Sequence, residues 1–362
     1  MRSHFRVISG ARRPPSGWTR GLIVFLLVAI AAPFLIPAFS GRAAATGNPS
    51  GSDDPDEALT WVEFTPTAAA MRAAMDIDIA WHGEADAPDC TWIDLLALYS
   101  ARHGGNYKDF RTGALTELKE KIEGGASLSS LTKNEKLLAY YSRAYHAALD
   151  GMVGEYTRVV VTLDADGNAH EERESAYGLR VFSPIGAGYS YTDYDDFGAS
   201  RSYGYKRSHL GHDLLGSVGT PIVAVESGTV EHLGWNPYGG WRIGIRSFDG
   251  MRYYYYAHLR RGHPFVTDLY EGRVVHAGEV IGYLGMTGYS AKPDTNGINV
   301  PHLHLGLQLI FKPSQVEGWN QIWLDLYQFM RFWGQNTSRS SYCEAKGDRV
   351  AAVYYEYPEE PD

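Results

Sequence analysis

The sequence predicts an α+β multidomain protein in which an N-terminal membrane segment is followed by a small α-helical domain and then by an all-β antiparallel domain. Three observations predict this order. A basic flank precedes a long apolar run, apolar residues next recur at helical spacing, and short β-branched and aromatic runs separated by glycine and proline fill much of the second half. With 362 residues and 44% apolar content, the chain can build two hydrophobic cores and a tether.

The N-terminal part carries a membrane-targeting pattern. Residues 1–20 are a basic cytoplasmic flank, residues 21–39 are an apolar run of 19 residues, and no acidic residue precedes Asp53. This order places the rest of the chain outside the cytoplasmic membrane. The run is long enough to span a bilayer, but Pro33, Pro37 and nearby small residues also fit a cleaved signal peptide. A single-pass anchored protein and a secreted protein are both open.

The next two segments are a tether and a helical domain. Residues 40–57 are rich in Gly, Ser, Pro and Asp, which is typical of a flexible tether. The α-helical domain is expected at 58–156, and it contains no motif with recognisable chemistry. Its predicted helical segments are 67–75, 92–99, 112–123 and 133–149.

A connecting segment at 157–200 leads to the β-rich domain, which is expected at 201–315. In the connection, Val159–Leu163 followed by Asp166-Gly167 predicts a hairpin. In the β-rich domain, Asp249-Gly250 predicts that the strands on either side of it pair antiparallel. The runs predicted as strands are 223–225, 229–233, 241–246, 252–258, 280–284 and 303–310.

The C-terminal segment 316–362 is expected to hold a helix and an acidic tail. Ile322–Trp333 has apolar residues at helical spacing, so it is predicted to be a packing helix. The acidic, proline-bearing tail 354–362 is predicted to be disordered.

Charge and cysteine content limit the partners. The net charge is −9 for the chain and about −15 without residues 1–46, which hold six of the 33 basic residues and none of the 42 acidic ones. Nucleic acid is therefore not expected as a partner. Cys90 and Cys343 lie in different predicted parts. Outside the membrane they can form a disulfide, and two free buried thiols are the alternative.

Five residues of the second half form one chemical constellation. His209 and Asp213 lie in SHLGHD, His258 ends YYYYAHL, and His302 and His304 lie in PHLHLGLQL. A catalytic zinc ion takes three protein ligands from His, Asp or Glu and leaves its fourth position to water. His209, Asp213 and one histidine of the HLH motif can supply these ligands.

The spacing of the HLH motif allows one of its histidines to bind the metal and the other to transfer a proton. On a β-strand, residues i and i+2 project from the same face, so one of His302 and His304 can bind the metal while the other lies over the bound water. That second imidazole and His258 are suited to act as general base and as the group that stabilises the developing oxyanion. Each of these histidines alone is more often a structural residue. No other set of residues in the sequence predicts a functional site as strongly as the five together.

The segment from about Tyr203 to Ile310 resembles the lysostaphin-type (LytM-like) zinc metallopeptidases, bacterial endopeptidases that cut the cross-linking peptides of peptidoglycan. The match runs in order through HLGHD (209–213), GTPIVAVESGTV (219–230), YGGWRIGI (238–245), YYAHL (255–259), VHAGEVIGYLGMTG (275–288) and HLHLGL (302–307). The resemblance implies the duplicated hybrid motif fold, which is barrel-sandwich-like and antiparallel, and one Zn²⁺ per chain.

The resemblance also assigns the site residues. His209, Asp213 and His304 are the zinc ligands that it implies, and His302 and His258 are the implied catalytic pair. The implied function is zinc-dependent hydrolysis of peptidoglycan cross-links during cell wall remodelling. A non-catalytic wall-binding or partner-binding scaffold on the same fold is the alternative.

The resemblance bears on three further features of the chain, and the sequence next to the HLH motif on a fourth. The family places a tyrosine shortly before the first ligand to stabilise the transition state; Tyr203 is the candidate, with Tyr205 as its rival. His212 departs from the family pattern, and because it neighbours Asp213 on a strand, a supporting or surface role is expected for it. The stretch 189–207 is a candidate for covering the cleft and inhibiting the enzyme. The polar loop 289–300 is expected to form a cleft wall.

Overall fold

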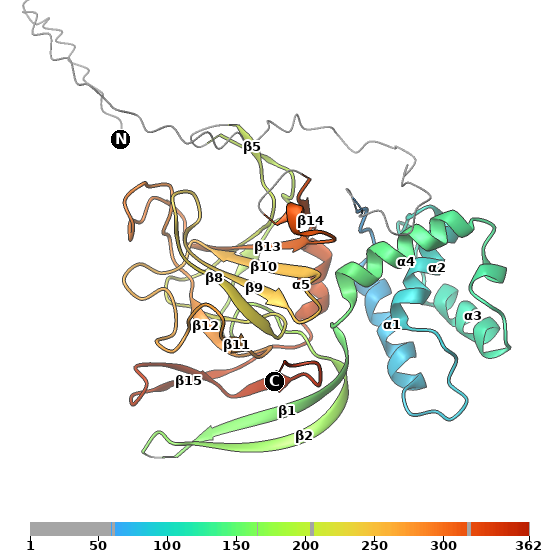
Figure 1. Ribbon diagram of the computed structural model, residues 1–362, viewed down its shortest axis with the longest axis horizontal. Helices are drawn as coiled ribbons and strands as arrows, with labels where there is room; N and C mark the ends of the chain where they lie inside the picture. Colours follow the sequence, from blue (N-terminus) through green and yellow to red (C-terminus); the bar gives the residue numbers. More distant parts are fainter. Residues whose placement is uncertain (1–58, 60–61, 165, 203–205, 317–319, 362) are drawn as a thin grey trace, which may run out of the picture. The chain divides into compact units, whose positions relative to one another are not determined.

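The computed structural model describes residues 59, 62–164, 166–202, 206–316 and 320–361. The basic flank, the transmembrane or signal segment and the tether lie outside these residues, so they stay predictions. No helix in the described ranges is long and apolar enough to cross a membrane. A helical part precedes a larger β-rich part within one compact unit (Figure 1).

Four helices form the helical part, and each predicted helical segment falls on one of them. Polar side chains cap the N-termini of three of these helices. They accept hydrogen bonds from backbone N–H groups of the first turn, which have no partner inside the helix. Thr67 accepts from the N–H of Ala70, Thr91 forms a capping box with Asp94, and Asn134 caps the last helix. The elements are α1 Ala68–Trp81, α2 Trp92–His103, α3 Thr112–Glu123, the 3-10 turn η1 Ser129–Leu131 and α4 Glu135–Leu149.

A three-stranded sheet follows the helices. β1 (Val153–Leu163) and β2 (Ala169–Leu179) pair antiparallel around the predicted turn, where Gly167 has a φ of 83°. The hairpin is therefore confirmed. Its first strand begins at Val153, inside the segment that was expected to be helical.

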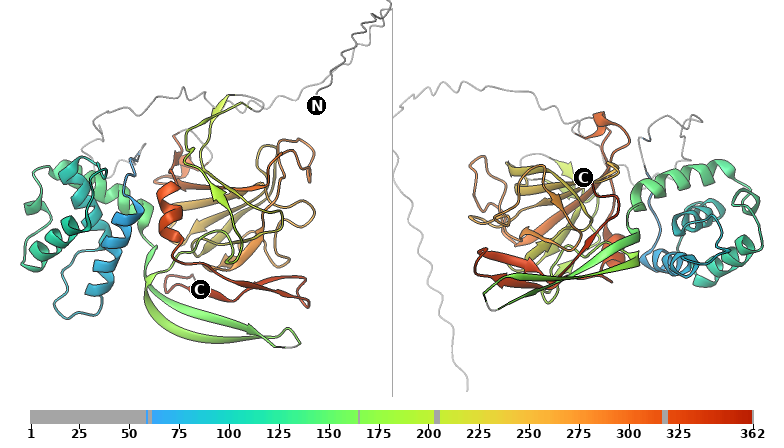
Figure 2. Two further views of the ribbon diagram at one scale, coloured as in Figure 1. Left: turned by 180° about the vertical axis from the view of Figure 1, so that it is seen from behind. Right: turned by 60° about the horizontal axis from the view of Figure 1, so that its bottom comes forward.

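The third strand of this sheet corrects the prediction of a disordered tail. β17 (Val353–Glu356) pairs with the other edge of β1, and Tyr355 and Tyr357 are buried. Tyr357 donates a hydrogen bond to the carbonyl of Arg180 at 2.7 Å. The tail is ordered because an edge strand offers unpaired backbone groups and the tyrosines add apolar surface. Figures 1 and 2 show the neighbouring β15–β16 hairpin (Ser340–Cys343 and Asp348–Ala351) alongside β1 and β2.

An eight-stranded antiparallel sheet forms the centre of the β-rich part, with the strand order β11-β8-β9-β10-β13-β6-β3 and β14 attached to β13. β9 and β10 pair across the turn at Gly250, as predicted. The strands are β3 Thr192–Asp193, β6 His212–Leu215, β8 Gly228–Asn236, β9 Gly240–Ser247, β10 Arg252–Ala257, β11 Val274–Val275, β13 His302–Leu309 and β14 Ile322–Trp323.

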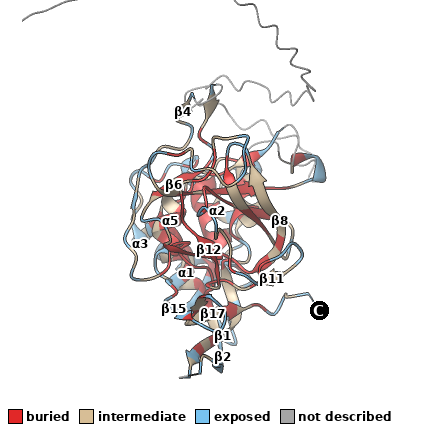
Figure 3. Ribbon diagram, turned by 90° about the vertical axis from the view of Figure 1, so that its left-hand side faces the viewer, coloured by how far each residue is buried: buried red, intermediate tan, exposed pale blue. Residues whose placement is uncertain are grey.

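Two small sheets accompany this one. β7 (Pro221–Val223) pairs with β12 (Val280–Tyr283), and β4 (Ser200–Arg201) pairs with β5 (Arg207–Ser208). Ile243, Leu305 and Ile281 are fully buried in one apolar cluster, so one face of the large sheet packs against β7 and β12. Figure 3 shows this burial in red along the strands. The opposite face of the large sheet carries the candidate functional site.

The predicted helix at Ile322–Trp333 is partly wrong. Only Tyr327–Trp333 is helical (α5), whereas Ile322 and Trp323 form β14. Pairing with the edge of β13 supplies backbone hydrogen bonds that a short helical segment would otherwise supply, so tertiary context overrides the helical spacing. α5 then packs on the helical part, where Phe332 stacks on Trp92 with ring centroids 5.6 Å apart.

Both cysteines are free thiols, so the alternative to the disulfide holds. The Cys90 thiol lies against the carbonyl of Thr91, and the Cys343 thiol lies against the carbonyl of Gly167 in the β1–β2 turn. Both side chains are buried. Burial also raises the pKa of the Cys90 thiol to about 12, so very little thiolate forms there at neutral pH.

We therefore expect neither thiol to react with iodoacetamide at neutral pH in the folded protein. Both should react after unfolding in guanidinium, giving two added labels by mass spectrometry. The non-reduced protein serves as the control, because a disulfide would leave no label in either state. Rapid labelling of the folded protein would contradict the buried positions.

Candidate active site

The outer face of the eight-stranded sheet carries a cluster of histidines. β13 pairs with β6 so that His304 lies opposite Asp213. Along β13, Leu303 and Leu305 are fully buried on the core side, while His302 and His304 line a cavity on the other side. Alternation along the strand therefore brings both histidines of the HLH motif to one face, as their spacing predicts.

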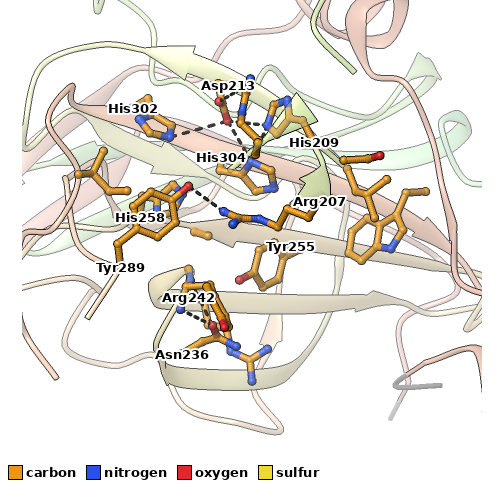
Figure 4. A pocket seen from close by; sticks show the side chains of 18 of the residues that line it. Arg207, His209, Asp213, Asn236, Arg242, Tyr255, His258, Tyr289, His302 and His304 are labelled. Atoms are coloured by element: carbon orange, nitrogen blue, oxygen red, sulfur yellow. Dashed lines mark hydrogen bonds and ion pairs between the residues drawn. The ribbon is translucent and has the colours of Figure 1, made fainter. Parts of the chain in front are cut away.

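Three potential ligand atoms converge beside this strand (Figure 4). His209 Nε2 is 3.0 Å from Asp213 Oδ1 and 3.0 Å from His304 Nδ1. His304 Nδ1 is 2.9 Å from the same oxygen of Asp213. Among the described residues, these three are the group whose ligand atoms lie close enough together to hold one metal ion.

The chemistry of this set fits a divalent metal ion. His209 Nδ1 donates to the side-chain Oδ1 of Asp196 at 3.1 Å, which leaves Nε2 of the neutral ring with a lone pair. That lone pair, a nitrogen of His304 and a carboxylate oxygen then face one another. A tetrahedral ion with bonds of ~2.0–2.1 Å has edges of about 3.4 Å between its ligand atoms, so small shifts would accommodate it.

The absence of a side chain at Gly211 makes room for His304, one of the three candidate ligands. A Cβ atom at Gly211 would lie 2.5 Å from His304 Cε1 and 2.7 Å from the carbonyl oxygen of Leu305. Only glycine therefore fits at this point of the HLGHD motif while His304 keeps its position.

The electrostatics of the cluster favour the protonation states that bind metal. Burial opposes ionisation of Asp213, but hydrogen bonds with His209 and His304 outweigh it and hold the pKa of the carboxyl well below its usual value. Burial lowers the pKa of His304, against the attraction of Asp213. A carboxylate anion and neutral imidazoles are the forms that ligate metals.

His258 and His302 form a second pair beside the three candidate ligands, with ring centroids 4.7 Å apart. His258 follows β10 at a φ of 61°, and its Nδ1 donates to the carbonyl of Thr287 at 2.9 Å. His302 Nδ1 donates to the carbonyl of Val300 at 2.8 Å, while its Nε2 is 3.8 Å from Asp213 Oδ1. Each ring therefore keeps the Nε2 lone pair available as a proton acceptor.

Burial and the neighbouring histidines keep His258 neutral. Burial is the largest cause, followed by the charges of His302 and His304, and together they lower the pKa of His258 to about 3. At neutral pH, His258 can accept a hydrogen bond at Nε2 but carries no positive charge.

The cluster opens into a cavity of about 710 Å³. Tyr253 and Tyr255 of β10 line its floor, whereas Tyr254 and Tyr256 are fully buried in the core. Four residues of the predicted wall loop 289–300 also line it: Tyr289, Gly297, Ile298 and Asn299.

Comparison with known proteins decides what this segment is. The model of peptidase family M23 matches residues 207–316. This segment is a peptidase family M23 domain. The resemblance to the lysostaphin-type peptidases is therefore confirmed for the β-rich part of the chain.

Relatives of the M23 domain include two named peptidases. An L-Ala--D-Glu endopeptidase of Bacillus subtilis is 38% identical over 150 residues, which are 41% of this chain and 42% of the relative. Lysostaphin of Staphylococcus staphylolyticus is 38% identical over 97 residues, 26% of this chain and 18% of the relative. The chain thus spans less than half of either curated relative. A crystal structure of a lytM protein from Ruminococcus gnavus aligns with a TM-score of 0.46 and 20% identity, covering 79% of this chain and 92% of that one.

The candidate tyrosine of the M23 domain, Tyr203, and its rival Tyr205 lie outside the described residues. His212 is fully buried, and its Nε2 lies 2.8 Å from Asp193 Oδ2. A surface role for His212 is therefore wrong, whereas a supporting role agrees with this contact, which ties β6 to β3.

Two residues that the sequence did not single out contact the candidate ligands of the M23 domain. Asp196 bonds to His209 as described, and Arg201 pairs with both Asp196 and Asp213, at 3.3 Å from Asp213 Oδ2. Both belong to the stretch 189–207 that was considered as a cover for the cleft. No local motif marks them, because the contacts depend on how this stretch folds back on the sheet.

Proposed function

We propose that the chain is a zinc-dependent endopeptidase that hydrolyses peptide cross-links of bacterial peptidoglycan. The observation that carries this proposal is the convergence of three ligand atoms next to a histidine pair in a 710 Å³ cavity. The names of two relatives, an L-Ala--D-Glu endopeptidase and lysostaphin, support a peptidase acting on the cell wall.

In this proposal His209, Asp213 and His304 hold the zinc ion. When bound, zinc polarises the scissile carbonyl and makes water a nucleophile at neutral pH. His302 receives the water proton at Nε2, since its Nδ1–H is already used by the carbonyl of Val300. The protonated ring then returns this proton to the departing amine. His258 accepts a hydrogen bond at Nε2 and orients the water.

Asp196 and Arg201 have distinct supporting roles. Asp196 fixes the orientation and tautomer of His209 through its bond to Nδ1. Arg201 places a positive charge on the oxygen of Asp213 that faces away from the two imidazoles. The N-terminal pattern supports action outside the cytoplasmic membrane, at the cell wall, by an anchored or secreted enzyme.

The test is to incubate the zinc-loaded protein with purified cross-linked peptidoglycan and to identify released fragments by mass spectrometry. We expect uncross-linked peptides, and their new termini will identify the bond that is cut. His302→Ala should release none while retaining about one zinc per chain, because His302 is not among the three ligands.

Two results would contradict the proposal. Folded, zinc-loaded wild type that releases nothing would favour the scaffold function. An unchanged rate for His302→Ala would exclude His302 as the general base.

A further inference from the structure

The cavity of the M23 domain is cationic although the chain as a whole is acidic. Arg201, Arg207 and Arg242 line it, and Asp213 is the one carboxylate among the described lining residues. The chain carries a net charge of −9. A cleft lined by one sign of charge concentrates ligands of the opposite sign, so this cavity favours anionic peptides over neutral ones.

Arg242 lies in one row with the metal-ligand cluster. Ile243 pairs with Tyr256, which pairs with Leu305, so these three form a cross-strand row facing the core. Ala257 pairs with His304, and continuing the β9–β10 register by one residue places Arg242 opposite Ala257 on the cavity face. Figure 4 shows Tyr255 between Arg242 and His304.

This row sets the distance between Arg242 and the candidate metal site at His304. Arg242 and His304 are separated by two strand spacings, or about 10 Å. An extended peptide covers this distance in about three residues. Ala257, between them in the row, is fully buried, and Tyr255 lines the cavity beside it.

Arg242 differs from the neighbouring arginines in its partners. Arg246, four residues along the same strand, pairs with Glu231 at 2.7 and 3.0 Å. Arg201 is neutralised by Asp196 and Asp213. Among the residues that the structure describes, no carboxylate lies within ion-pair distance of Arg242.

Arg242 is a lining residue of the cavity and acts electrostatically on the tyrosines of its floor. Burial raises the pKa of Tyr253 and of Tyr255, and the charge of Arg242 acts on both phenols in the opposite direction. Arg242, Tyr253 and Tyr255 all line the same cavity. The planar set of N–H donors of the Arg242 guanidinium matches a carboxylate through two parallel hydrogen bonds.

We propose that Arg242 binds a carboxylate of the substrate about three residues from the scissile bond, so that the enzyme selects acidic wall peptides over uncharged glycine bridges. This inference rests on the proposed peptidase function and adds its substrate class. Arg207, which donates to the Tyr289 hydroxyl at 2.8 Å, adds positive charge to the lining of the cavity.

The experiment compares two forms of one substrate, with the full zinc-loaded chain. Soluble cross-linked muropeptides are used either native or after carbodiimide coupling to ammonia, which converts their carboxylates to carboxamides. We expect kcat/KM to be about tenfold higher for the native form, as for one charge-assisted hydrogen-bonded pair. Arg242→Gln should remove most of this preference, and Arg242→Lys should retain part of it.

Arg246→Gln is the matched control, because it removes the same charge from the same face of the same strand and should keep the preference. Equal cleavage of both forms by wild type would overturn the inference and leave the peptidase function intact. A preference that is unchanged in Arg242→Gln would overturn the assignment to Arg242. If neither form is cleaved, the proposed function falls and the inference falls with it.

Discussion

His304→Ala is expected to lose the metal ion and the peptidase activity together. The substitution removes one of three atoms that lie within about 3 Å of one another, leaving His209 and Asp213 as the remaining ligands. Even groups that only hydrogen-bond to a metal ligand are worth about 10–100-fold in affinity. We therefore expect a loss of zinc affinity of more than about 100-fold, with activity falling to background.

Zinc content per chain and the rate of peptidoglycan hydrolysis measure this outcome on the same preparation. His170→Ala is a suitable control, because His170 lies on β2 with an exposed side chain and outside the ligand group. Circular dichroism establishes that each variant is folded. Full zinc content in folded His304→Ala would exclude His304 as a ligand.

Glu226→Ala is expected to lower the free energy of unfolding by about 3 kcal/mol, because it removes the buried partner of a buried arginine and leaves only the partly exposed Asp249, 2.7 Å away, as its counter-charge. Arg252 is 1% exposed and Glu226 is 3% exposed. Two hydrogen bonds of 2.9 Å join them, and Tyr254 donates to the same carboxylate at 2.6 Å. Arg252 also donates to the carbonyl of Ala147, so this pair connects the sheet to α4.

Guanidinium titrations followed by tryptophan fluorescence measure this loss. Glu231→Ala is the matched control, since it removes a carboxylate from Arg246, whose pair is partly exposed and should contribute less than about 1 kcal/mol. If the two variants lose equal stability, the buried pair does not stabilise the junction as argued.

The local pattern of the sequence was sufficient for much of the fold and of the site. Turn pairs such as Asp249-Gly250 predicted hairpins because their backbone conformation depends on adjacent residues. The HLH spacing brought His302 and His304 to one face because strand alternation is a local property. Glycine at 211 and the histidine and aspartate beside it belong to one short motif, which also identified the family.

Only the tertiary structure determined the contacts between separate segments of the chain. Nothing near Tyr355 indicates that the tail pairs with β1, about 200 residues earlier in the chain. The contact of Asp196 with His209 and the burial of His212 arise in the same way. Periodicity and short motifs thus determined the helices, the strands and the candidate ligands. Only folding decided which edges pair, which charges are buried and which arginine faces the cleft, because these depend on contacts between segments that local sequence does not specify.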